Sequence, residues 1–168
     1  MTANVSRAAF LLATGLALSS AASARDVGGV DTVFHTLTPN DKIRIEAFED
    51  PKVSGVTCFV SRAVKGGALS IVGLAEDPSD ASIACRQTGP ITFREAIEGD
   101  KDGEEVFNEK RSVMFKTLHV TRFFDQASQS LVYLTWSDKL IDGSPKNSLS
   151  AVTLQPWGTQ AAAKPALK

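Results

Sequence analysis

The sequence predicts a mainly β (α+β) domain, built as a single antiparallel sandwich or a partly open barrel with one or two short helices. Three observations predict this class. Segments in which apolar and polar residues alternate recur along the chain. Turns that contain glycine or polar residues separate several of them, and only short stretches carry helix-start signals. Alternation with a period of two is typical of half-buried antiparallel strands.

The first half of the chain contains a predicted strand pair. DKIRIEAF alternates through its two isoleucines, and VTCFVSRAV places Val56, Cys58 and Val60 on one face. Lys65–Gly67 supplies a glycine turn, because glycine accepts positive φ at no steric cost. The segment ALSIVGL that follows is the expected partner strand.

The second half contains a predicted hairpin. VMFKTLHVTRFF and SLVYLTW flank a loop at Asp125–Gln129. The first of these segments has apolar residues on both faces, so we expect cover on both sides over part of its length. LSAVTL is one further strand.

One helix is expected to begin at Asp77. This residue suits the N-cap position, and Pro78 suits the first helical position. The stripe formed by Ala81, Ala84 and Cys85 has helical spacing, and Gly89–Pro90 ends it. A second helix competes with a strand over TFREAIEG, and the sequence does not decide between them.

The N-terminus has the pattern of an export signal. The apolar stretch Ala8–Leu18 is too short to span the roughly 30 Å of bilayer hydrocarbon. Ala22 and Ala24 follow in the small-x-small pattern that signal peptidase accepts, so we expect cleavage after Ala24. No other segment is apolar enough to cross a membrane.

The expected organisation is a signal peptide over residues 1–24, a β-rich domain over 25–156 and a disordered tail over 157–168. The tail has no apolar face. The formal net charge of −1 excludes broad attraction to nucleic acid. We therefore expect no nucleic-acid partner, and no motif calls for a cofactor.

The two cysteines, Cys58 and Cys85, allow one disulfide bridge, which is the expected state in an oxidising compartment. Closing the loop between them would stabilise the fold by on the order of 3.5 kcal/mol. Free thiols and metal ligation are the alternatives. The pair lacks the C-x-x-C spacing of redox motifs, and the scattered histidines do not complete a zinc site.

Several long strings resemble the CreA family of bacterial periplasmic proteins over about Gly28 to Val152. They are VDTVF, EAFEDPKVSGVTCFVSRA, LAEDPSDASIACRQTGPI, RFFD and SDKLIDGSPKNSLSAV. The resemblance implies a periplasmic location and supports the pairing of Cys58 with Cys85. The family is associated by name with catabolite regulation and has no settled biochemical activity, so the resemblance supplies no catalytic residues.

Two segments contain candidate ligand contacts. DGSPKNS offers Ser144, Lys146 and Asn147 as groups that hold an anion, although the same residues dominate ordinary turns. Arg86 extends from the expected helix as a further surface contact. The partner expected here is a protein or a small molecule of the periplasm.

The segment EGDKDGEEVFNE partly matches an EF-hand calcium loop. Asp100, Asp102, Gly103 and Glu109 fall at the third, fifth, sixth and twelfth places, while Glu98 takes the first place, where aspartate is preferred. A solvated acidic loop is the alternative explanation.

The leading hypothesis is a non-enzymatic binding module linked to envelope or catabolite physiology, because no nucleophile–base spacing, metal cluster or nucleotide loop stands out. The alternative is a small hydrolase that assembles distant residues, with Ser144, His119 and an acid as the candidates. A calcium-stabilised structural protein is the third hypothesis.

Overall fold

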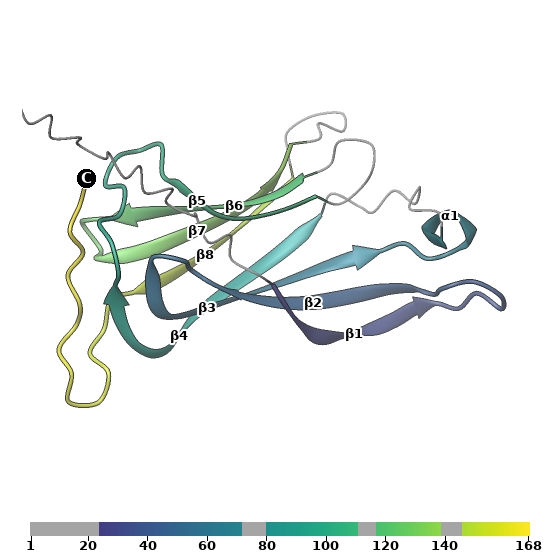
Figure 1. Cartoon of the computed structure of the whole chain (residues 1–168), viewed down its shortest axis with the longest axis horizontal. Helices are drawn as coiled ribbons and strands as arrows, with labels where there is room; N and C mark the ends of the chain where they lie inside the picture. Colours follow the sequence, from purple (N-terminus) through teal and green to yellow (C-terminus); the bar gives the residue numbers. More distant parts are fainter. Residues whose placement is uncertain (1–23, 72–79, 111–116, 139–145) are drawn as a thin grey trace, which may run out of the picture.

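A computed structural model describes residues 24–71, 80–110, 117–138 and 146–168. Within these ranges the chain forms eight strands and one short helix, arranged as two four-stranded antiparallel sheets (Figure 1). The mainly β prediction is confirmed, and the sheets stack as a sandwich without closing into a barrel.

Both sheets follow the order of the chain. Sheet 1 has the order β1-β2-β3-β4, and sheet 2 has the order β5-β6-β7-β8. The bounds in sheet 1 are β1 (Arg25–Val33), β2 (Asp41–Glu49), β3 (Val53–Val64) and β4 (Ala81–Phe93), with helix α1 (Ala68–Ile71) after β3. The bounds in sheet 2 are β5 (Glu104–Lys110), β6 (Thr117–Asp125), β7 (Ser130–Ser137) and β8 (Asn147–Thr153).

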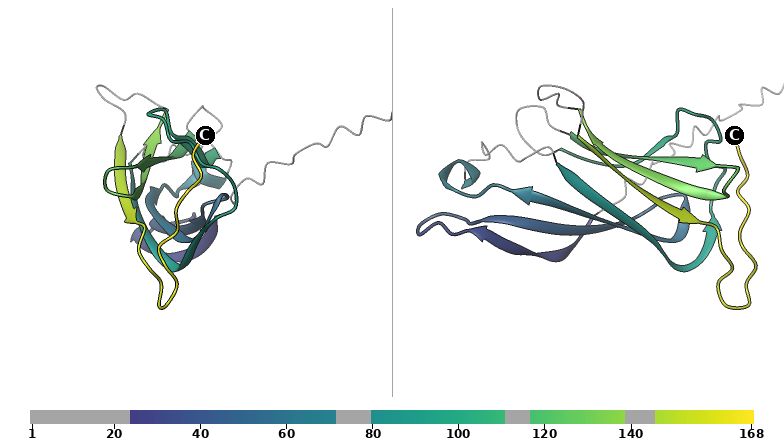
Figure 2. Two further views of the ribbon diagram at one scale, coloured as in Figure 1. Left: turned by 90° about the vertical axis from the view of Figure 1, so that its left-hand side faces the viewer. Right: turned by 180° about the vertical axis from the view of Figure 1, so that it is seen from behind.

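The core lies between the facing sides of the two sheets. Val56, Cys58 and Val60 are at most 1% exposed, which confirms that they share a buried face. Phe48 of sheet 1 stacks on Phe107 of sheet 2, with ring centroids 4.5 Å apart. This contact joins the two sheets, which the end-on view in Figure 2 shows as separate layers.

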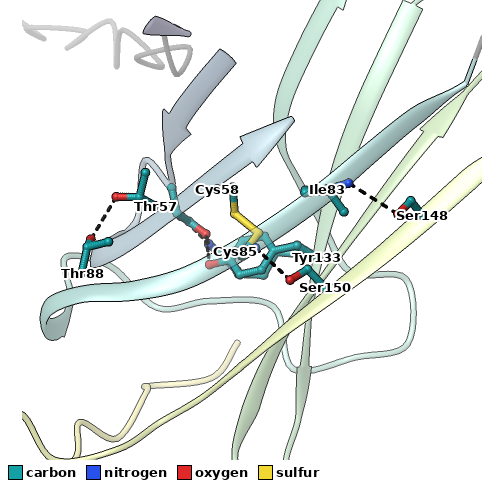
Figure 3. Close-up of a disulfide and its surroundings, with 10 residues drawn as sticks. Thr57, Cys58, Ile83, Cys85, Thr88, Tyr133, Ser148 and Ser150 are labelled. Carbon is teal, nitrogen blue, oxygen red and sulfur yellow. Dashed lines mark hydrogen bonds and ion pairs between the residues drawn. A yellow bond between two sulfur atoms is a disulfide. The ribbon is translucent and has the colours of Figure 1, made fainter. Parts of the chain in front are cut away.

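The disulfide Cys58–Cys85 is formed and links directly opposed residues of β3 and β4. Next to it, β8 lies along β4 (Figure 3). The hydroxyls of Ser148 and Ser150 accept hydrogen bonds from the backbone N–H groups of Ile83 (3.4 Å) and Cys85 (2.8 Å). The disulfide therefore sits where the two sheets meet at one side of the sandwich.

The prediction of a helix around Cys85 is wrong, because this segment is strand β4 from Ala81 to Phe93. Side chains at 83 and 85 are buried while those at 82, 84 and 86 are exposed. The strand continues past Gly89–Pro90, and the register with β3 shifts opposite Gly55. Gly55 has φ 80°, and a Cβ there would lie 2.4 Å from the Pro90 carbonyl oxygen. The two strands thus approach closely at this point. Asp77 and Pro78 lie outside the described residues.

Of three further expectations, one changes, one open choice is resolved and one is confirmed. Ala68–Ile71 is helix α1 instead of a strand, although the glycine turn before it is present, with Gly67 at φ 80°. TFREAIEG forms no helix: its first residues end β4 and Ile97 pairs with Leu167. The predicted hairpin loop at Asp125–Gln129 is confirmed.

The C-terminal segment contacts the residues around Ile97. Ile97 exchanges backbone hydrogen bonds with Ala166 and Lys168, and Ile97 is fully buried. Ala163 of the same segment packs against the core.

Sheet 2 covers only part of sheet 1. In both side views β1, the adjoining ends of β2 and β3, and α1 extend past the end of sheet 2 (Figures 1 and 2). We call this part, residues 25–45 and 61–71, the wing, and the remainder of the two sheets the body.

Candidate functional site

Among the predicted ligand contacts that the structure describes, Lys146 and Asn147 are neighbours at the start of β8, whereas Arg86 lies farther along β4. Lys146 pairs with Asp80 at 3.4 Å, and both side chains are exposed. Asn147 begins β8. Arg86 lies six positions beyond Asp80, about 20 Å along an extended strand. Ser144 lies outside the described residues.

The acidic residues of the predicted calcium loop point to different partners. Glu98 pairs with Lys168 at 3.1 Å. Asp100 accepts hydrogen bonds from the N–H groups two and three residues on, at 3.0 and 3.3 Å. Glu109 lies on β5 beside Arg62, at 3.5 Å. In the ranges that the structure describes, no three acidic, histidine or cysteine side chains gather as a metal site. The second half of the segment, from Glu104 on, is strand β5 rather than loop.

His119 sits in a polar cluster on the outer face of sheet 2. Its ring stacks on Trp136, with centroids 4.3 Å apart. Nδ1 lies 2.5 Å from Glu105 Oε2, and Nε2 lies 3.8 Å from Asp138 Oδ2. The side chain of Asn108 donates to the second Glu105 oxygen at 2.6 Å.

Hydrogen bonds stabilise the charged form of both carboxyls. Partial burial raises the pKa of Glu105, but the bonds from Asn108 and His119 outweigh it, so the pKa lies below its ordinary value of 4.5. The backbone N–H of Thr117 lowers the pKa of Asp138 below 3.8. Among the described residues the His119 ring contacts carboxylates rather than a hydroxyl. Ser144, the serine of the alternative hydrolase hypothesis, lies outside those residues.

A buried ionic cluster connects the sheets, and sequence reasoning missed it. Arg122 on β6 is 1% exposed and bonds both oxygens of Asp50 at 2.6 and 2.5 Å. A second Arg122 nitrogen bonds Glu104 at 2.5 Å, and the Tyr133 hydroxyl donates to Asp50 at 3.1 Å. Asp50 also accepts the backbone N–H groups of Lys52 and Val53, at 2.8 and 3.1 Å.

This cluster is structural in character. Burial is the main cause that raises the pKa of Tyr133 well above 10, and the neighbouring Asp50 charge acts in the same direction. The tyrosine therefore serves as a neutral donor. Arg122 stands in the buried row of β6 among apolar residues, and its position there is the sequence signal that could have revealed a buried partner.

Exposed apolar side chains gather on the wing. Leu37 is 92% exposed and Phe34 is 79% exposed, both at the tip of the β1–β2 hairpin. Gly67 of the neighbouring turn donates to Pro39 of that tip at 2.8 Å, which brings α1 beside it. Within the described ranges, the exposed large apolar residues of the wing are Val27, Val30, Val33, Phe34, Leu37, Ile43, Leu69 and Ile71, against Leu149, Trp157 and Leu167 elsewhere.

The paired strands of the wing carry most of their apolar residues on the face opposite to the core. Directly paired residues of antiparallel strands share a face, and Val30 pairs with Ile43, which pairs with Ala63. The opposite row, on the same side as the core residue Phe48, is mainly charged: it holds Asp26, Asp31, Lys42, Arg44 and Arg62, with Gly29 and Val64 as uncharged members. The outer row holds Val30, Val33, Ile43, Ile45 and Ala63, with Gly28 and with Arg25, Asp41 and Ser61 as polar members.

These features define a class: a two-sheet β-sandwich with a cross-strand disulfide and an exposed apolar wing. No helix in the described ranges is long and apolar enough to cross a bilayer.

The sequence matches the family described as CreA protein over residues 27–157, and the chain belongs to that family. It is 50% identical over 141 residues to Protein CreA of Escherichia coli K12, covering 83% of this chain and 90% of the relative. Protein CreA of the O6:H1 and O157:H7 strains gives the same values. No solved structure matches the chain.

Proposed function

We propose that this chain is an exported, non-catalytic protein of the periplasm that binds a protein partner through its wing. The exposed apolar residues of the wing carry the proposal. Contiguous exposed apolar surface is rare on soluble proteins and marks interaction sites. Each Å² removed from water on binding contributes about 25 cal/mol.

The features that support export are independent of the wing. The N-terminal pattern ends at Ala24, and β1 begins at the next residue, Arg25. The Cys58–Cys85 bridge suits an oxidising compartment. Binding in the periplasm would place the protein in envelope physiology, where a link to catabolite regulation would act through the partner.

The shape of the wing favours a protein over a small molecule. Its apolar residues lie along a sheet face and a hairpin tip, whereas small-molecule sites are concave and enclose most of the ligand.

Site-specific photo-crosslinking in living cells tests the binding proposal. A photoreactive residue at Leu37 should give a discrete adduct with an envelope protein. The matched control is Leu149, which is 61% exposed on the outer face of sheet 2 and should give none. Equal adducts from both positions, or none from Leu37, would contradict the proposal.

Mass spectrometry of the protein recovered from the periplasmic fraction tests export. The expected mature chain begins at Arg25 and has no free thiol. Recovery of the uncleaved chain in the cytoplasm would reject this part.

A further inference from the structure

The free edge of β1 borders the apolar face of the wing. β1 is the outermost strand of sheet 1, and all nine of its residues are exposed. An edge strand presents backbone N–H and C=O groups that another extended segment can pair with. The apolar outer row and this edge meet at Val30, which is 66% exposed.

The charges along β1 indicate which kind of peptide segment can pair with this strand. Asp26 and Asp31 both lie on the inner side of β1, where they pair with Glu46 and Lys42 of β2 in the strand register. Asp26 bonds Arg44 at 3.0 Å yet keeps 57% of its side chain exposed. Asp31 accepts the side-chain amide of Asn40 at 3.0 Å. The inner side of β1 itself is therefore acidic, with the basic residues Lys42 and Arg44 on the neighbouring strand β2.

A second copy of the chain fits this edge poorly. Pairing two β1 strands would bring the aspartates of both copies to the same side of the joint sheet, where like charges repel. Charges placed along an edge in this way protect it against self-association.

We propose that the wing binds an extended peptide segment with alternating apolar and basic residues, which adds to sheet 1 as a strand beside β1. The apolar side chains of the segment extend the outer row from Val30, and its basic side chains face Asp26 and Asp31. Backbone hydrogen bonds supply affinity, and the alternating side chains supply specificity. This inference rests on the proposed function and names the partner class.

Two labelled nine-residue peptides, one of alternating valine and lysine and one of alternating valine and glutamate, test the inference by fluorescence anisotropy with the purified mature chain. The lysine peptide should bind about tenfold more tightly, because two or more like-charge contacts are exchanged for attractive ones. Hydrogen exchange of the β1 amides should slow when it binds.

Charge variants of β1 test whether the peptide binds at the edge of this strand. Asp31→Lys should shift the preference toward the glutamate peptide, and Asp31→Asn, which keeps an acceptor for Asn40, should reduce the preference without reversing it. Asp102→Lys makes the same charge change in an exposed loop outside the wing and should leave the preference unchanged. Equal affinity for both peptides, or binding without protection of β1, would overturn the inference.

A second copy of the chain and a lipid surface are the two other possible partners of the wing, and each would give its own result. A dimer in sedimentation equilibrium that protects β1 without peptide would assign the edge to a second copy. Leu37-dependent flotation with phosphatidylglycerol vesicles would assign the wing to lipid. Either result overturns strand addition. If the Leu37 crosslink in cells persists while the lysine peptide fails, only strand addition falls; if the crosslink is also absent, the proposed function falls with it.

Discussion

The two halves of sheet 1 place their apolar residues on opposite faces. In the body, Phe48, Val56 and Cys58 face sheet 2 and are buried, while Glu49 and Arg86 face solvent. In the wing, Arg44 and Arg62 take the inner side and Ile43 takes the outer side. The same alternating backbone thus serves two purposes: the body closes a core, and the wing leaves an apolar face uncovered.

The contrast separates residues that stabilise the fold from residues that are available for binding. Burial of charge in the body is compensated by multiple hydrogen bonds, as at Asp50. Exposure of apolar area in the wing has no such compensation, so the wing gains free energy only when a partner covers it. Substitutions in the two regions should therefore have effects of different size and kind.

The largest expected effect is in the body. Asp50→Ala removes the bidentate partner of the buried Arg122 and leaves it Glu104 as an ionic partner, and it also removes the acceptor for two backbone N–H groups. We expect a loss of about 3–5 kcal/mol in the free energy of unfolding, measured by urea denaturation. Asp26→Ala, which removes an exposed ion pair of the wing, is the control and should cost less than about 1 kcal/mol. Similar losses in both variants would erase the distinction between body and wing.

Removal of the disulfide should have the next largest effect on the free energy of unfolding. The Cys58→Ala, Cys85→Ala double variant opens a loop with a sequence separation of 27. Its free energy of unfolding should fall by on the order of 3.5 kcal/mol. A reductant should lower the free energy of unfolding of the wild type to about the value of the variant, and it should leave the stability of the variant unchanged. If the reductant affects both proteins equally, the bridge does not act through loop closure.

The polar cluster on the outer face of the body gives a smaller, pH-dependent effect. Folding lowers the pKa of Glu105 below 4.5 and that of Asp138 below 3.8. Their contribution is therefore present above these ordinary values and is lost as pH falls through the lower folded-state values. Both carboxylates are partly exposed, so the contribution should stay below about 1 kcal/mol.

His119→Gln tests this contribution, because it removes the ring that Glu105 contacts. The urea midpoint of the variant should fall less than that of the wild type between about pH 5 and pH 3. Parallel curves for the two proteins would show that the contact with His119 does not stabilise these carboxylates.

The smallest effect on stability is expected in the wing. Leu37→Ser changes a side chain that is 92% exposed, so the free energy of unfolding should change by no more than about 0.5 kcal/mol. The same variant should abolish partner capture at the wing. A loss of several kcal/mol would mean that Leu37 supports the fold instead.

Local patterns predicted strands well where a single face is buried. The alternation through Val56, Cys58 and Val60 was placed correctly, and the Asp125–Gln129 hairpin depends on its own sequence. Local patterns failed for β4, because its start resembles a helix N-terminus while its pairing with β3 depends on distant residues. They also failed for Arg122, whose partner Asp50 is far away in the chain.

The candidate site shows the same limit. The alternation of Ile43 and Ile45 is visible in the sequence, but a period of two does not state which side of a sheet meets the core. Only the tertiary structure shows that sheet 2 packs on the side of Phe48, which leaves the row of Ile43 and Ile45 on the opposite face of sheet 1.

The sequence by itself determined the mainly β class, the family and the cysteine pair, because these depend on residue types and on short-range alternation. The tertiary structure alone decided that Cys85 lies on a strand, that Arg122 is neutralised inside the body and that the apolar row of the wing faces outward. The physical reason is that burial and pairing depend on which distant segments meet.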